Sequence, residues 1–157
     1  AERYETLIHT IRQCIPHCTI GCDVMVGFPG ETDQDFMMTA RFLEALPVSY
    51  LHVFPYSERP GTAAVLLTPK VPEQVKKERA GILNTLAVEK RRTFYESWKG
   101  KRCEVLFENR DGKTGFWKGK SRHYLPVHVA SPESLTGERR EVEILETNGE
   151  NALGVLR

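Results

Sequence analysis

Apolar residues recur every three or four positions at the start of the chain, which is the spacing of one face of an α-helix. The positions that carry this pattern are Tyr4, Leu7, Ile8, Ile11 and Ile15. Pro16 cannot continue a helix, so the pattern predicts an amphipathic helix over residues 2–15. No capping residue precedes it, and we therefore expect that the chain is a piece of a longer protein.

A strand, a helix and a second strand follow in the pattern. Residues 19–28 form a short apolar run, which predicts a buried strand, and residues 48–54 are β-branched and aromatic, which predicts another. Between them, Thr32 is a suitable N-cap for a helix that reaches residue 46. Two strands joined through a crossover helix indicate a parallel pair.

The pattern changes near residue 99. Residues 72–98 predict one long charged helix, for which Gly100 is a suitable C-terminal residue. The residues expected on or near its packed face are Val75, Arg79, Ile82, Leu83, Leu86, Val88 and Phe94. Residues 101–157 contain five short strand-like runs at 103–108, 115–118, 125–130, 142–145 and 152–156. We expect an α/β domain over residues 1–98 and a small β-barrel of the OB or SH3-like kind over residues 99–157.

Composition limits the class of protein. The chain has 157 residues, of which 40% are hydrophobic and 27% charged, as in globular proteins, and it has no apolar run of membrane-spanning length. The first residues are polar, unlike a signal peptide, so the expected location is cytoplasmic, with no membrane partner.

Positive charge is concentrated in one segment. Residues 99–124 carry eight Lys or Arg against three Asp or Glu, whereas residues 125–157 carry three against six. Cations neutralise phosphates and aromatic rings stack on unpaired bases, so the mixture predicts RNA binding. The candidate RNA-binding residues are Lys101, Arg102, Phe116, Lys118, Lys120, Arg122, His123 and Tyr124. The alternative is that Phe116 and Tyr124 belong to the barrel core and the lysines to a solvated rim. We expect the acidic second half of the barrel to face away.

Two loops are candidates for ligand binding, because each follows a predicted parallel strand and ligands bind at the carboxyl ends of such strands. The first is the cofactor candidate and comprises Val26, Gly27, Phe28, Pro29, Gly30 and Glu31. Its glycines allow a flat or anionic ligand to approach the backbone, or they merely permit a tight turn. The second is the substrate candidate and contains Tyr56, Ser57, Arg59 and Thr62. Arg59 is suited to clamp a carboxylate or phosphate, or it pairs with Glu58 or with an acidic residue of a helix.

Three cysteines are spaced like a metal-binding triplet. Cys14, Cys18 and Cys22 follow a C-x3-C-x3-C pattern, but they run from a predicted helix into a predicted strand and need not converge. We interpret them as structural, and the sequence leaves open whether they ever bind a metal.

Taken together, these segments resemble the carboxyl half of radical S-adenosylmethionine methylthiotransferases. The resemblance rests on Gly27-Phe28-Pro29-Gly30-Glu31-Thr32, on His52-Val53-Phe54-Pro55-Tyr56-Ser57, on Arg59-Pro60-Gly61-Thr62 and on the terminal barrel, which resembles a TRAM domain. The segment His52-Val53-Phe54-Pro55-Tyr56-Ser57 is most similar to the branch of the family that acts on threonylcarbamoyladenosine in tRNA. Asp23 and Met25 stand where related enzymes often have glycine and isoleucine, and His123 stands where TRAM domains usually have asparagine.

The resemblance implies the last strands of a partial (β/α) radical barrel, with S-adenosylmethionine bound at residues 26–31. It also implies a tRNA anticodon stem-loop as partner, methylthiolation at C2 of the modified adenosine beside the anticodon, and 4Fe–4S clusters. The cysteine ligands of those clusters belong to an amino-terminal half that this chain lacks, so no catalytic or metal-ligating residue is assigned here and we predict that the chain alone is inactive. The alternatives are an enzyme that modifies a ribosomal-protein aspartate and a non-catalytic RNA-binding adaptor.

Overall fold

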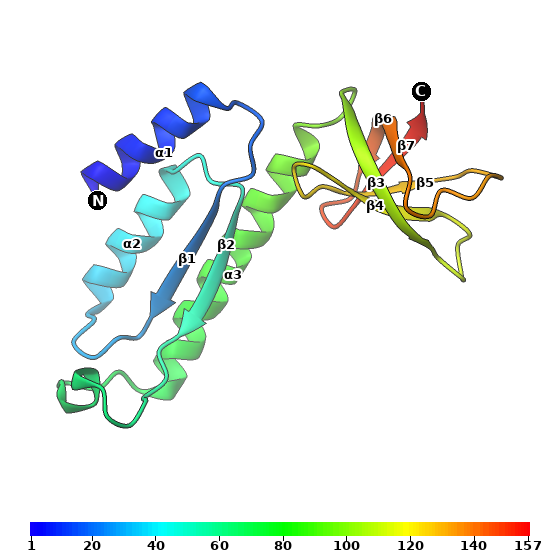
Figure 1. Ribbon diagram of the computed structural model, residues 1–157. Helices are drawn as coiled ribbons and strands as arrows, with labels where there is room; N and C mark the ends of the chain where they lie inside the picture. The colour runs from blue at the N-terminus through cyan, green and yellow to red at the C-terminus, as the bar shows by residue number, and fades with distance from the viewer. The chain divides into compact units, whose positions relative to one another are not determined.

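The computed structural model describes residues 1–157, which form two compact units, residues 1–90 and residues 91–157 (Figure 1). The first unit contains α1 (Glu2–Cys14), β1 (Gly21–Val26), α2 (Asp33–Ala45), β2 (Tyr50–Pro55), the short helix η1 (Ala63–Leu66) and most of α3 (Glu73–Glu96). The second contains the end of α3 and the strands β3 (Arg102–Arg110), β4 (Trp117–Ser121), β5 (Pro126–Val129), β6 (Arg139–Thr147) and β7 (Ala152–Leu156).

The first unit is built on the predicted parallel pair. β1 and β2 pair in parallel from Gly21 opposite Tyr50 to Val26 opposite Pro55, which confirms the expected crossover. The predicted N-cap is also confirmed. The Thr32 hydroxyl accepts from the Asp35 N–H, and the Asp35 carboxylate accepts from the Thr32 N–H, forming a reciprocal capping box that starts α2.

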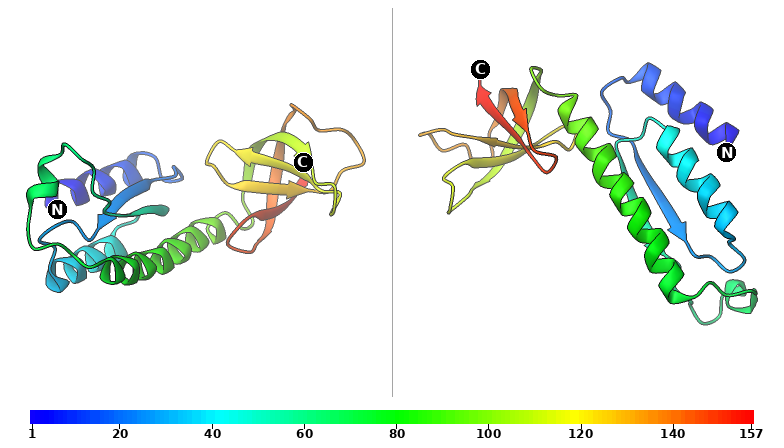
Figure 2. Two further views of the ribbon diagram at one scale, coloured as in Figure 1. Left: turned by 90° about the horizontal axis from the view of Figure 1, so that it is seen from below. Right: turned by 180° about the vertical axis from the view of Figure 1, so that it is seen from behind.

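Helices cover only one face of this strand pair. Figure 2 shows α2 and α3 along the same face of β1 and β2. Cys22 and Val26 on β1 and Leu51 on β2 are buried there, and they pack with apolar residues of all three helices. On the other face Met25 and Phe54, which are direct neighbours across the pair, are 53% and 50% exposed. Side chains alternate between the two faces along each strand, so the residues between the buried ones lie on the face that no helix covers.

The packed face of α3 differs in part from the predicted one. Leu83 is fully buried, but Ile82 and Val88 are each 54% exposed, so these two assignments are wrong. Arg79, on the predicted face, is buried, and so is Lys76, although both are charged. Apolar periodicity placed Ile82 and Val88 inside, whereas the helix buries long polar side chains against the turn that follows β1.

The second unit confirms the predicted small barrel. Its five strands close in the order β3-β4-β5-β7-β6, antiparallel except for the β5–β7 pair. The core is apolar and includes the fully buried residues Val105, Phe107, Leu125, Val129 and Ile144. Tyr95 and Trp98, at and beyond the end of α3, also belong to this core. The strand predicted at residues 115–118 begins two residues later, at Trp117.

Candidate functional site

The turn after β1 is shaped by two glycines with left-handed backbone. Gly27 and Gly30 have φ values of +75° and +89°. A Cβ at Gly27 would lie 2.4 Å from Cγ of Lys76, whereas a Cβ at Gly30 would meet nothing within 4 Å. Gly27 is therefore required by internal packing as well as by its backbone angle, and only Gly30 leaves open space beside the chain.

A buried ion pair holds this turn from the inside. Glu31 Oε2 accepts from the Gly27 N–H at 2.7 Å and from Arg79 Nη1 at 2.5 Å. Arg79 Nη2 donates to Asp33 Oδ1 at 2.7 Å. Burial alone lowers the pKa of Arg79, but the hydrogen bonds to Asp33 and Glu31 outweigh it and raise the pKa above its ordinary value. Glu31, predicted as a cofactor contact, thus faces the protein and positions the turn.

The backbone of this turn does not form a cradle for an anion. An anion site needs N–H groups that point at the ligand. Here the N–H of Gly27 is taken by Glu31, that of Gly30 by the Pro69 carbonyl at 2.9 Å, and that of Glu31 by the Phe28 carbonyl at 2.9 Å. Phe28 is 41% exposed and is the large apolar side chain on the outside of the turn. The three bonded N–H groups offer no site for a phosphate, and the exposed ring of Phe28 is the contact surface that remains.

The loop after β2 brings one candidate residue to this turn and leaves three in solvent. Tyr56 is buried, and its ring packs edge-on against Phe28 with centroids 5.2 Å apart. Lys76 Nζ lies 5.4 Å from the centre of the Tyr56 ring. The Tyr56 hydroxyl is buried without a hydrogen-bond partner. Ser57, Arg59 and Thr62 are exposed.

Arg59 is available for a ligand. Glu58 pairs with Lys70 at 2.6 Å, and the hydrogen bond from Lys70 lowers the pKa of Glu58, so the alternative pairing of Arg59 with Glu58 is wrong. The Arg59 carbonyl accepts from the Thr62 hydroxyl at 2.9 Å, which closes the Pro60-Gly61 turn. The guanidinium itself is left in solvent at the carboxyl end of β2.

The cysteines do not assemble into a metal site. Cys14 is exposed, Cys18 is half-buried and Cys22 is buried, and all are reduced thiols. Among the 157 residues no group of three or more His, Cys, Asp or Glu side chains is arranged to hold a metal ion. Cys103 lies in the barrel core, where burial raises its pKa to about 11. The residues present do not fit an iron–sulfur cluster.

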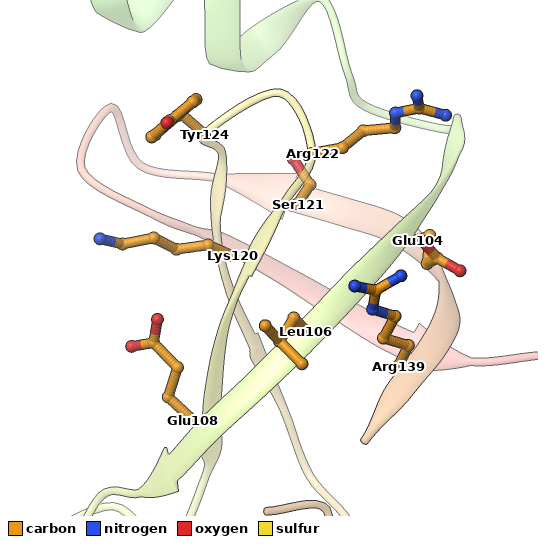
Figure 3. A pocket seen from close by; sticks show the side chains of 8 residues that line it. All are labelled: Glu104, Leu106, Glu108, Lys120, Ser121, Arg122, Tyr124 and Arg139. Atoms are coloured by element: carbon orange, nitrogen blue, oxygen red, sulfur yellow. The ribbon is translucent and has the colours of Figure 1, made fainter. Parts of the chain in front are cut away.

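The barrel carries a groove of about 590 Å³ on its outer surface. Figure 3 shows its lining, which comes from β3, β4, β6 and the turn after β4. The lining residues are Glu104, Leu106, Glu108, Lys120, Ser121, Arg122, Tyr124 and Arg139. Three predicted RNA-binding residues, Lys120, Arg122 and Tyr124, therefore meet in one place.

Tyr124 is presented by a strained turn. It is 74% exposed, so the alternative that it belongs to the barrel core is wrong. Its φ is +58°, a left-handed value that non-glycine residues seldom adopt. Ser121 holds it there, because the Ser121 carbonyl accepts from the Tyr124 N–H and the Ser121 hydroxyl accepts from the N–H groups of His123 and Leu125.

The other predicted RNA-binding residues lie outside this groove. Lys118 pairs with Asp111, and Arg102 lies 3.7 Å from carboxylate oxygens of both Glu141 and Glu143. Lys101 Nζ is 6.0 Å from the centre of the Trp98 ring, and His123 packs on that ring at 4.6 Å. Phe116 lines a separate recess with Arg110.

Five of the eight residues that line the groove were not predicted from the sequence. Leu106, Glu104 and Glu108 follow the alternation of a strand that was predicted, so the period of two could have found them. Arg139 comes from the acidic second half, which was expected to face away, and that expectation is wrong for this residue. The position of Arg139 depends on the pairing of β6 with β3, which cannot be predicted from the local sequence pattern.

Comparisons with known proteins identify relatives. No protein-family model matches the chain. It is 50% identical over 111 residues to the threonylcarbamoyladenosine tRNA methylthiotransferase of Aquifex aeolicus, an alignment that covers 69% of this chain and 27% of that protein. It is 36% identical over 156 residues to a tRNA-2-methylthio-N6-dimethylallyladenosine synthase of Jannaschia, covering 99% of this chain and 34% of that protein. The same enzyme of Maricaulis maris is 37% identical over 144 residues, covering 92% and 32%.

The chain thus spans about a third of the length of the curated relatives it matches. None of its helices has the length and apolar character needed to cross a bilayer.

Proposed function

Because the chain belongs to the family of tRNA methylthiotransferases, we propose that it is the carboxyl-terminal part of a radical S-adenosylmethionine enzyme that methylthiolates C2 of N6-threonylcarbamoyladenosine beside the anticodon. The observation that carries the choice of substrate is the 50% identity over 111 residues to an enzyme named for that nucleoside. In this proposal residues 1–98 are the last part of the radical barrel with its long connecting helix, and residues 99–157 are its RNA-binding TRAM domain.

The turn after β1 would hold the adenine of S-adenosylmethionine. Phe28 offers an exposed ring for stacking, and Gly30 leaves space beside the backbone. Val26, Gly27 and Pro29 are buried and keep this surface in place, while Glu31 and Arg79 fix the turn from behind. When bound together with a reduced iron–sulfur cluster, S-adenosylmethionine supplies the radical chemistry. The cluster would be held by parts of the enzyme outside this chain, so the chain alone is proposed to be inactive.

Arg59 would recognise the threonylcarbamoyl group. That group ends in a carboxylate, which a guanidinium can bind through two parallel hydrogen bonds. The guanidinium is unpaired at the carboxyl end of β2, where ligands of parallel α/β folds bind. The dimethylallyl group of the other nucleoside has no charge, so Arg59 gives it no comparable contact.

The second candidate substrate is N6-dimethylallyladenosine. It is favoured by the two relatives named for that nucleoside, whose alignments cover 92% or more of the chain. All three relatives are named for tRNA nucleosides, and for this reason neither a ribosomal-protein aspartate nor a purely adaptor role is proposed.

The test is analysis of tRNA nucleosides. The complete enzyme is expressed in a bacterial strain that lacks both methylthiotransferases, and the digested tRNA is examined by mass spectrometry. The expected product is 2-methylthio-N6-threonylcarbamoyladenosine. Formation of only the methylthio-dimethylallyl nucleoside would overturn the substrate choice, and formation of neither would overturn the proposed function.

A variant of Arg59 tests its proposed role in substrate recognition. Arg59→Gln removes a charge-assisted contact and should lower kcat/KM for threonylcarbamoyladenosine tRNA by about 10–100-fold. Arg41→Gln is the matched control, since Arg41 is an exposed arginine of α2 in the same unit. Equal activity of the two variants would contradict the role of Arg59.

A further inference from the structure

The charged residues of the barrel groove have no ion-pair partners. Five charged side chains line it, namely Glu104, Glu108, Lys120, Arg122 and Arg139. None of them forms an ion pair, even though both signs are present. Elsewhere on the barrel, opposite charges do pair, as in Arg140 with Glu138 at 2.7 Å and Arg157 with Glu143 at 2.8 Å. The groove therefore keeps its charges available for a ligand.

These charges are ordered around an apolar centre. Leu106 on β3 is 41% exposed and lies directly opposite Lys120 on β4 and Arg139 on β6. Glu104 and Glu108 lie two residues before and after it, and they line the same groove (Figure 3). A cation thus lies on each side of Leu106 across the strands, and a carboxylate lies on each side of it along its own strand.

An aromatic ring completes the groove. Tyr124 lines it and is held in a left-handed backbone conformation that its residue type disfavours. Strained, exposed side chains of this kind cluster at functional sites, because a surrounding structure must be retained to hold them. The Ser121 hydrogen bonds described above are that structure.

The carboxylates restrict the ligand. Glutamates would weaken the affinity of a surface that binds only phosphates, because the two negative charges repel each other. An ionised carboxylate can only accept hydrogen bonds, so it selects a donor such as the exocyclic amino group of a base. Lys120, Arg122 and Arg139 are suited to the phosphates on either side of such a nucleotide, and Tyr124 with Leu106 to the face of its ring.

We propose that this groove binds one unpaired nucleotide of an RNA and prefers a base that carries an exocyclic amino group over the same base without it. The proposal rests on the proposed function in that RNA is the ligand. Single-stranded RNA is favoured because its base edges and faces are open to side chains. A groove of about 590 Å³ is within the size range of sites for small ligands, about 300–1,000 Å³.

The test compares two RNA strands that differ in one amino group. The 157-residue chain is titrated into fluorescent nine-nucleotide oligouridylates that carry either adenosine or purine riboside at the centre, and binding is followed by anisotropy. Purine riboside is adenosine without its amino group. We expect about tenfold tighter binding of the adenosine strand, the effect of one hydrogen bond to a charged group. Cytidine and pyrimidin-2-one riboside form a second matched pair with the same expectation.

The variant E104A/E108A tests whether the two glutamates cause the preference for the amino group. It should bind both strands equally, and should bind the purine riboside strand more tightly than the unmodified chain does, because two repulsive charges are gone. Glu146→Ala, an exposed glutamate of β6 outside the groove, should keep the tenfold preference. Circular dichroism confirms that each variant is folded.

Two outcomes would overturn the proposal, and they differ in meaning. Equal binding of both strands by the unmodified chain would refute base selection while leaving RNA binding intact. Absence of salt-dependent binding to any strand would refute the groove as an RNA site. Neither result decides the proposed methylthiolation, which the tRNA nucleoside analysis tests independently.

Discussion

Tyr124 shows at the scale of one residue how stability and function can oppose each other. Its left-handed backbone costs an L-residue roughly 1–2 kcal/mol, whereas asparagine adopts this conformation more readily. Tyr124→Asn should therefore raise the thermal midpoint of the barrel. The same change removes the ring proposed to stack on a base, worth about 1–3 kcal/mol per base, and should weaken RNA binding by about 5–150-fold. Calorimetry and anisotropy measure the two effects.

Tyr124→Phe is the control for this prediction. It keeps the ring and the strained backbone, so both the midpoint and the RNA affinity should stay near those of the unmodified chain. A Tyr124→Asn chain that melts at a lower temperature would contradict the argument from strain.

The lowered pKa of Asp111 predicts how the stability of the barrel depends on pH. The hydrogen bond from Lys118, then the N–H groups of Thr114 and Lys113, hold the pKa of this carboxyl far below its usual range. The charged form is therefore favoured in the folded state. Its contribution is present above the unfolded-state pKa of about 4 and is lost as pH falls toward the lower folded pKa.

Asp111→Asn keeps a hydrogen-bond acceptor and removes the charge. The variant should be less stable than the unmodified chain at pH 7, and the difference should shrink steadily below about pH 4. Urea unfolding at pH 7 and at pH 2.5 measures this. A stability difference that stays constant with pH would show that the charge of Asp111 contributes nothing.

At the scale of elements, α3 fixes the turn that follows β1. The Glu31 side chain is only 13% exposed and Arg79 only 6%, so Arg79→Met would leave a buried carboxylate without its cation. Breaking a buried pair in this way costs about 3–5 kcal/mol. Arg79→Met combined with Glu31→Gln removes both charges and should recover most of that loss. Urea unfolding of the two single variants and the double variant gives the coupling, and strictly additive losses would contradict it.

The order of the elements could be predicted from local patterns. Alternation and helical spacing report which face of a segment is buried, Thr32 marks the start of α2, and Pro16 follows the end of α1, whereas α3 ends at Glu96, before the predicted Gly100. The same patterns misplaced Ile82 and Val88, which are each 54% exposed, and did not select Lys76, which is buried. Apolar spacing alone does not identify the buried face of a helix that also buries charged side chains such as Lys76 and Arg79.

Contacts between distant segments could not be predicted. Arg79 and Glu31 are 48 positions apart, and Arg139 reaches the groove through pairing with Leu106 on a different strand. The sequence identified Lys120, Arg122 and Tyr124 because they share one segment with the basic strip. It did not identify Arg139, which the barrel brings in from an acidic segment, since strand register is set by the closed sheet as a whole.

At the scale of the whole molecule, the chain has two hydrophobic cores with no residue in common. Leu83 of α3 belongs to the core of the first unit, and Val105 of β3 belongs to the barrel core; both are fully buried. Since hydrophobic stabilisation comes from the contacts within each core, the two units should unfold as separate steps.

Core truncations test this separation. Leu83→Ala should cost about 2–5 kcal/mol and lower hydrogen-exchange protection in β1 and β2, while protection in β3–β7 stays unchanged. Val105→Ala is the reciprocal variant and should lower protection in the barrel strands alone. An equal loss of protection in both units from either variant would instead mean that the chain unfolds as one cooperative body. Independent units would allow the surface groove of the barrel to change in sequence without disturbing the turn after β1.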